Sequence, residues 1–205
     1  LINVADSGEN SISVAPGANA HLTPEIINQY REVILSADII LMQLEIPIET
    51  VYQVARMAHA AKIPVVLNPA PAREIDHDIL AMLSIITPNE HEALLISGVG
   101  IDTKSVSGMA IEIQKLGVQA VIITTGKEGA LYRENDKEEI VQGIAVKAID
   151  TTAAGDTFNG YLVVQLAQGK PIREAIKIAN KAAAISVTRL GAQPSIPEIE
   201  DLQNE

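Results

Sequence analysis

One stretch of the chain has residues whose types and spacing could support chemistry on an anion. It runs from Ile149 to Gly160 and reads Ile-Asp-Thr-Thr-Ala-Ala-Gly-Asp-Thr-Phe-Asn-Gly. The small residues 153–155 stand where a strand is expected to turn into a helix. Backbone N–H groups without bulky side chains can approach an anion there, and the helix dipole adds a partial positive charge. Asp156, in the first turn of the expected helix, is placed to act as a base beside that anion.

An ordinary capped helix explains the same residues. A carboxylate in the first turn stabilises a helix through the dipole alone, and a strand followed by a turn of small residues and a helix is common. Local chemistry therefore leaves both interpretations of Asp156 open.

The rest of the chain alternates short apolar runs with stretches of helical spacing. This pattern predicts an α/β protein with a doubly wound, mostly parallel sheet flanked by helices. A short run of alternating apolar residues, 144–149, predicts the strand that leads into the stretch above. The other expected strands are 37–44, 64–67, 84–87 and 120–125, and the expected helices are 48–62, 90–97, 105–116, 154–168 and 172–187.

Smaller features complete the expected secondary structure. Turn-forming residues 6–10 predict a hairpin within residues 1–14, and Asn135-Asp136 predict a second one within 130–142. Thr23-Pro24 starts a helix whose apolar spacing continues to Ile34. The helix 172–187 is apolar on most of its surface and is expected to be buried, and the acidic tail 198–205 is expected to form a terminal helix. The apolar face of helix 48–62 is predicted to consist of Val51, Val54, Ala55, Ala58 and Ala61.

The composition excludes several classes of protein. A chain of 205 residues can build one domain with a sizeable core. Its net charge of −11 and its lack of Trp argue against nucleic acid or an anionic membrane as a partner. Without Cys there is no disulfide framework and no thiolate zinc site, which is compatible with the cytoplasm, the location we expect. No Walker A, G-x-G-x-x-G or G-x-S-x-G pattern occurs, no His pair has ligand spacing, and no secretory signal is visible.

The segment Asp150–Gly160 resembles the signature of the ribokinase-like (pfkB) carbohydrate kinases, and its Thr-Ala-Ala form is typical of the ribokinases among them. The resemblance implies that Asp156 contacts the sugar and removes the proton of its hydroxyl. It also implies that the backbone of Ala153, Ala154 and Gly155 forms an anion hole for the phosphoryl group. The implied activity is phosphorylation of D-ribose by ATP at the 5-hydroxyl, giving D-ribose 5-phosphate.

The same resemblance assigns roles to other motifs. Glu45, at the end of the run Met42–Glu45, would help to bind the sugar, although the start of a loop before Pro47 also explains it. Asn89 and Glu92 match an N-x-x-E motif associated indirectly with Mg²⁺ and with phosphate placement. A plain turn explains the 124–129 loop equally well, and a helix-surface amide explains Asn180. The implied ATP-binding residues are Asn89, Thr124, Thr125, Gly126, Lys127, Glu128, Gly129, Gly155 and Asn180.

A monovalent-cation site is also implied by the resemblance. The family binds K⁺ there as an activator, with several backbone carbonyls as ligands, while Mg²⁺ accompanies ATP. The matching positions are Asp150, Thr152, Ser186, Arg189, Gly191 and Ser195.

The chain starts at Leu1 rather than Met, so we expect a fragment or a processed product. Family members carry about a third more chain before the matching point, with the first strands, most of the sugar site and much of a β lid that helps to form a homodimer. Residues 1–14 are therefore expected to be a remnant of that lid, and residues 15–205 the nucleotide-binding and catalytic domain. The alternatives are another sugar or nucleoside kinase of this fold, such as a fructokinase, an inactive nucleotide-binding fragment, or an unrelated α/β protein with a chance signature.

Overall fold

The structure, a computed structural model, describes residues 15–98 and 105–202 together with the backbone of 2–4 and 10–12. The chain divides into two compact units. The first unit contains residues 1–15, 126–130 and 141–205, and the second contains residues 16–125 and 131–140.

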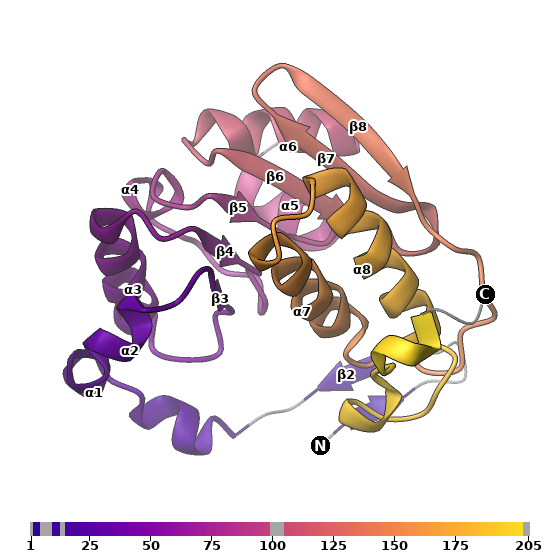
Figure 1. Ribbon diagram of the computed structural model, residues 1–205, viewed down its shortest axis with the longest axis horizontal. Coiled ribbons are helices and arrows are strands. Elements are labelled where there is room, and N and C mark those ends of the chain that lie inside the picture. Colours follow the sequence, from indigo (N-terminus) through magenta and orange to yellow (C-terminus); the bar gives the residue numbers. More distant parts are fainter. Residues whose placement is uncertain (1, 5–9, 13–14, 99–104, 203–205) are drawn as a thin grey trace. The chain divides into compact units, whose positions relative to one another are not determined.

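A six-stranded sheet, mainly in the second unit, has its strands in the order in which they follow along the chain. The first four strands are parallel, so Met42, Leu67, Ile86 and Val121 form one row across them. The predicted α/β fold with a mostly parallel sheet is confirmed. The strands are β3 (Ile40–Met42), β4 (Val65–Leu67), β5 (Ile85–Ile86), β6 (Ala120–Thr124), β7 (Gly129–Glu134) and β8 (Lys137–Gln142), as Figure 1 shows.

Helices α3, α5 and α6 of the second unit lie where they were predicted, whereas the short helix α4 was not expected. In α3 the predicted apolar face is buried as far as Ala58, but Ala61 is exposed, because it lies in the last turn beside the left-handed Lys62 that ends the helix. The helix that starts at Thr23-Pro24 is interrupted at Tyr30 and forms two short helices. The helices are α1 (Pro24–Gln29), α2 (Arg31–Leu35), α3 (Ile48–Ala61), α4 (His77–Leu80), α5 (Glu90–Ser97) and α6 (Val106–Lys115).

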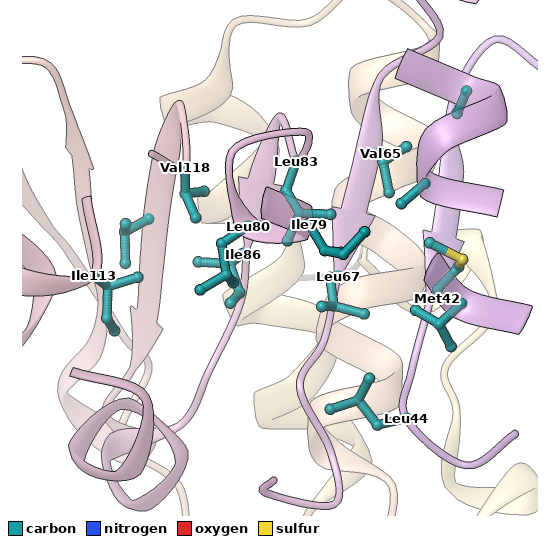
Figure 2. Close-up of a cluster of buried hydrophobic side chains, with 14 of the residues drawn as sticks. Met42, Leu44, Val65, Leu67, Ile79, Leu80, Leu83, Ile86, Ile113 and Val118 are labelled. Atoms are coloured by element: carbon teal, nitrogen blue, oxygen red, sulfur yellow. The ribbon is translucent and has the colours of Figure 1, made fainter. Parts of the chain in front are cut away.

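The core of the second unit lies where these helices cover the parallel strands (Figure 2). Leu67 and Ile86 from the sheet are fully buried, as are Ile79 and Leu80 from α4 and Ile113 from α6. Burying one such side chain stabilises the fold by roughly 1.5–3 kcal/mol. The strand ends, and the residues that follow them, are therefore held on a rigid framework.

The first unit is built on two long helices that pack against each other, α7 (Ala154–Ala167) and α8 (Ile172–Ser186). Two 3₁₀ turns follow, η4 (Gln193–Ser195) and η5 (Ile199–Leu202). The strands β1 (Ile2–Val4) and β2 (Asn10–Ile12) pair antiparallel, which confirms the predicted N-terminal hairpin. Residues 6–9 of the hairpin loop lie outside the described residues. In the acidic tail, residues 203–205 also lie outside them, and the described part forms only the turn η5 in place of the expected helix.

Two predictions for the first unit are wrong. Residues 143–148 belong to no strand, although their apolar residues alternate, and Ile144 and Val146 are 40% and 41% exposed. Alternation describes the face of a strand but does not supply a neighbour, and no described strand pairs with this segment. Helix α8 was expected to be apolar on most of its surface and buried, but it is amphipathic, and its first turns expose Arg173, Glu174 and Lys177.

The expected strand 37–44 is also shorter in the structure, since only Ile40–Met42 form the ladder of β3. Among the helices that the structure describes, none has both the length and the apolar character needed to cross a membrane.

Candidate active site

The turn into α7 is held by an alanine in the left-handed region. Ala153 is the N-cap of the helix, with φ 60° and ψ 15°. A non-glycine residue there costs roughly 1–2 kcal/mol and persists only where its surroundings fix it. Here the Ala153 carbonyl accepts hydrogen bonds from the Thr157 N–H at 2.9 Å and from its hydroxyl at 2.8 Å, and the Ala154 N–H donates to the Thr151 carbonyl at 3.3 Å. Residues strained in this way are typical of binding and catalytic sites.

Beyond this turn, the helix presents unused donors. The N–H groups of Ala153, Gly155 and Asp156 donate no hydrogen bond to any residue that the structure describes. Gly155 and Asp156 are exposed. The positive end of a helix of this length, with free N–H groups, suits an anion such as a phosphoryl group. The Ala154 N–H is already shared with Thr151, so Ala153 and Gly155 are the better donors of the predicted anion hole.

The Asp156 carboxylate lies beside these donors in the first turn of α7 and makes no side-chain hydrogen bond within the described chain. The next three residues, Thr157, Phe158 and Asn159, are buried and fix the turn that carries it. Asn159 also donates from its amide to the Gly155 carbonyl at 2.9 Å. An exposed carboxylate on a rigid turn is free to accept a proton from a bound hydroxyl group.

Behind the turn, the buried Asp150 ties two distant segments together. One of its oxygens accepts the Thr152 N–H at 2.9 Å and the other accepts the Gly191 N–H at 2.9 Å. The hydrogen bond from the Thr152 side chain, followed by those from the Thr152 and Gly191 backbones, holds the pKa of Asp150 below its usual value. The carboxylate is therefore anionic at neutral pH, and it joins the turn to the loop after α8.

That loop, residues 186–195, contains the other predicted cation-site residues. The Ile149 and Asp150 N–H groups both donate to the Val187 carbonyl, at 2.7 and 3.2 Å, and the Arg189 N–H donates to the Ser186 carbonyl at 3.0 Å. Ser186 and Ser195 are fully buried. The structure thus joins the two segments that contain the six predicted positions, 150–152 and 186–195, within the first unit.

The oxygen atoms of this cluster are suitable ligands for a monovalent cation. The carbonyl oxygens of Arg189 and Gly191 accept no hydrogen bond from the described residues, and the Asp150 carboxylate adds negative charge. Backbone carbonyls are the ligands that replace the hydration shell of K⁺ in selective sites. No three His, Cys, Asp or Glu side chains of the described residues gather as a metal-binding group. A cation here would therefore be held mainly by backbone oxygens.

The predicted nucleotide loop takes its shape from glycines. Residues Gly126–Glu128 form the 3₁₀ turn η3, with φ 57° at Gly126 and 104° at Gly129. The Gly143 N–H donates to the Glu128 carbonyl at 3.1 Å, and a Cβ at Gly129 would lie 2.1 Å from the Val141 carbonyl oxygen. Two backbones touch at Gly129 and Gly143, so no side chain fits there. Neither interpretation of the 124–129 loop, as part of an ATP site or as a plain turn, included Gly143, because no local pattern in the sequence connects it to this loop.

Asn180 is buried inside the first unit, so its interpretation as a helix-surface amide is wrong. Its amide nitrogen donates to the carbonyls of Val141 and Gln142, at 3.0 and 3.3 Å. Both amide protons are used in fixing the end of β8 to α8. Its predicted contact with a nucleotide can therefore involve only the amide oxygen.

In the second unit, Asn89 and Glu92 form a capping box at the start of α5. The Asn89 side chain accepts the Glu92 N–H at 2.9 Å, and the Glu92 carboxylate accepts the Asn89 N–H at 2.8 Å. Burial raises the pKa of Glu92, and the hydrogen bond from the Asn89 backbone offsets part of this. The N-x-x-E spacing is itself a capping signal, and the pair opens the helix that was expected at 90–97.

The second unit contains three other predicted site residues, Glu45, Thr124 and Thr125. The Thr124 N–H donates to the Pro88 carbonyl at 3.0 Å, and Thr124 forms a parallel bridge with Asn89, so these two predicted ATP-binding residues are neighbours. Glu45 follows β3 and is exposed, and it lines a hollow of about 420 Å³ whose other lining residues are mostly apolar, including those of β3. Its predicted contact with a sugar stays a prediction.

Replacing Glu92 with Gln should change how stability depends on pH. Because the raised pKa favours the protonated form in the folded state, Glu92 contributes stability that is complete below its ordinary pKa of 4.5 and is lost as the pH rises through the folded-state pKa. Gln does not titrate and can still accept the Asn89 N–H. The variant should therefore gain stability relative to the wild type as the pH rises from 4 to about 7, as urea unfolding at several pH values would show.

The exposed Glu90, in the same turn, is the matched control, and Glu90→Gln should show no such trend. Glu92→Ala removes the acceptor of the Asn89 N–H, and it should cost about 1 kcal/mol at low pH and less as the pH rises. A constant difference between Glu92→Gln and the wild type would contradict the assigned burial effect.

The chain resembles known proteins along nearly its whole length. The model of the pfkB family carbohydrate kinases matches residues 1–199. The chain belongs to the pfkB family. Members similar to it include the ribokinase of Haemophilus influenzae, 46% identical over 198 residues that cover 96% of this chain and 65% of that protein. This pfkB chain thus spans a little less than two thirds of that relative's length.

Solved structures of pfkB relatives agree in fold. The ribokinase of Thermotoga maritima superposes with a TM-score of 0.87 at 40% identity, covering 98% of this chain and 67% of that one. The ribokinase of Arabidopsis thaliana, solved with ribose and ATP, gives a TM-score of 0.88 at 31% identity, covering 98% and 66%. The expected ribokinase-like α/β fold is therefore confirmed. Membership in the pfkB family also accounts for the signature at Asp150–Gly160.

Proposed function

We propose that this chain carries the nucleotide-binding and phosphoryl-transfer machinery of a ribokinase, which phosphorylates D-ribose with ATP to give D-ribose 5-phosphate and ADP. The observation that carries the proposal is the start of α7, where N–H groups and the Asp156 carboxylate that have no partner among the described residues share one turn, fixed by Ala153. The similarity to ribokinases supports the choice of sugar.

In this mechanism the Asp156 carboxylate accepts the proton of the 5-hydroxyl group. The sugar oxygen forms its bond to the γ-phosphorus, the bond from phosphorus to the bridging oxygen breaks, and ADP leaves. The N–H groups of Ala153 and Gly155 stabilise the charge on the transferring phosphoryl oxygens. Positioned donors of this kind, more than covalent chemistry, accelerate phosphoryl transfer.

The proposal includes two metal ions. Mg²⁺ enters with ATP and supplies positive charge to the phosphates when bound. Glu92 is hydrogen-bonded and buried, so its role towards that ion would be indirect, through water. K⁺ would be held by the Asp150 carboxylate and by the carbonyl oxygens of Arg189 and Gly191, behind the anion-binding turn. Glu45 is proposed to contact the sugar, and a cytoplasmic homodimer remains our expectation for the whole enzyme.

ADP release from this chain with ATP, Mg²⁺, K⁺ and D-ribose tests the proposal. We expect release that depends on ribose and that falls when K⁺ is replaced by tetramethylammonium at the same ionic strength. Turnover with D-fructose or a nucleoside but not with ribose would instead favour another sugar or nucleoside kinase of this fold.

Calorimetric titration with ATP distinguishes an active kinase from the remaining alternative. ATP binding without turnover on any acceptor would favour an inactive nucleotide-binding fragment. Failure to bind ATP at all would overturn the proposal.

A further inference from the structure

The last described segment of the chain, residues 196–202, returns to the two helices of the first unit. The Tyr161 hydroxyl of α7 donates to the Pro197 carbonyl at 2.7 Å, and η5 packs against α8. Figure 1 shows this segment, in yellow, beside the C-terminal end of α8. The segment is thus fixed to the helix that precedes the 186–195 loop.

Asp201 connects this segment to the loop. One of its carboxylate oxygens accepts a hydrogen bond from the Arg189 guanidinium at 2.9 Å and another from the Glu198 N–H at 3.0 Å. Arg189 stands in the middle of the loop, between Ser186, to which its own N–H donates, and Gly191, whose N–H donates to Asp150. Hydrogen bonds, together with the short backbone stretch 189–191, therefore connect the C-terminal segment to the turn at the start of α7.

Packing does not by itself fix the Arg189 side chain. It borders a hollow of about 330 Å³, whose other lining residues include Ile144, Val146 and Lys181. The side chains of Arg189 and Asp201 are each 37% exposed. An ion pair as exposed as this contributes roughly 0–1 kcal/mol to global stability. The Arg189–Asp201 pair therefore contributes little to global stability, and what it can restrain is the local conformation of the loop.

The loop conformation matters because of two backbone oxygens. The Arg189 and Gly191 carbonyls have no hydrogen-bond partner in the described chain, so among the described residues only the path of the backbone orients them. Holding the Arg189 side chain from outside restricts that path. Without the restraint, the oxygens can turn away from Asp150 and the cation site loosens.

We propose that Asp201 is a positioning residue, which acts through Arg189 to hold the 186–195 loop and thereby sets the affinity of the cation site. This inference rests on the K⁺ site of the proposed function. It assigns a role to the C-terminal segment that is separate from the anion-binding turn and from the proposed base.

Thermal unfolding in increasing KCl tests this, with ADP present, no sugar, and tetramethylammonium chloride keeping the ionic strength constant. The K⁺ concentration for the half-maximal shift should rise about tenfold in Asp201→Ala, a typical size for coupling between sites. Asp201→Asn can still accept both hydrogen bonds and should behave nearly as the wild type. Glu200→Ala, which changes an exposed acid next to Asp201 in the same segment, is the matched control and should leave the midpoint unchanged.

A second measurement is independent of the ion. Hydrogen exchange without K⁺ should be faster in residues 186–195 of Asp201→Ala than in the wild type, while α7 exchanges equally in both. A wild type that responds to K⁺ together with an Asp201→Ala variant of unchanged midpoint would overturn this inference alone. A wild type that does not respond to K⁺ would overturn both the cation site of the proposed function and the inference that rests on it.

Discussion

Asp156→Asn is expected to abolish ribose-dependent ADP release while leaving ATP affinity within a few-fold. Removing a general base typically costs 10²–10⁴-fold in rate, and Asn cannot accept the proton of the sugar hydroxyl. Asn has nearly the same shape, and the Asp156 carboxylate makes no side-chain hydrogen bond within the described chain, so the fold should be unaffected. Initial rates of ADP release, with calorimetric titration of ATP, would measure the two effects separately.

Asp136→Asn is the matched control, because Asp136 is an exposed acid in the β7–β8 turn. It should retain full turnover. Equal turnover in Asp156→Asn and the wild type would rule out Asp156 as the base. A loss of ATP affinity as large as the loss of rate would instead indicate that the carboxylate acts in nucleotide binding.

Gly129→Ala is expected to destabilise the protein strongly, by about 2–4 kcal/mol. Two penalties add. At φ 104° an L-residue is strained, and the new Cβ would lie 2.1 Å from the Val141 carbonyl oxygen and 2.4 Å from the Gly143 nitrogen. These neighbours are backbone atoms, so they can move only if the segments separate and the hydrogen bond from Gly143 to Glu128 breaks. The midpoint of urea unfolding would measure the loss.

Gly160→Ala is the control for this variant. Gly160 lies inside α7 and no atom would lie within 4 Å of the added Cβ. Alanine favours a helix over glycine, so this variant should gain about 0.5–1 kcal/mol. If Gly129→Ala had the same midpoint of urea unfolding as the wild type, the two backbones could not be in close contact.

Much of the fold could be predicted because its signals are local. Helices α3, α5 and α6 keep the spacing of their apolar residues, and glycine or a left-handed residue follows their ends within a residue or two. The segment 144–149 shows the limit of such patterns. Its alternation describes one strand face, but pairing depends on a neighbour elsewhere in the chain, which no local pattern reveals.

The same distinction applies to the candidate site. The anion-binding turn and Asp156 lie within one continuous stretch, so the sequence displays them together. The hydrogen bond from Gly191 to Asp150 joins residues 41 positions apart, and the pair of Arg189 with Asp201 joins two surface residues of ordinary type. Burial of Asn180 depends on its contact with the end of β8, about 40 residues earlier in the chain. Such contacts arise from the tertiary fold, and only the resemblance to a family indicated that the first of them was near the site.

The order of the strands in the sheet bears on how this protein can be made. From β3 to β8 each strand lies beside the one that precedes it in the chain. A growing polypeptide can therefore extend the sheet at one edge as it leaves the ribosome, at about 5–20 residues per second, without waiting for a distant partner. Short separations between paired strands also keep the entropy of loop closure low and favour rapid folding. Synthesis and assembly of this sheet can thus proceed in the same direction.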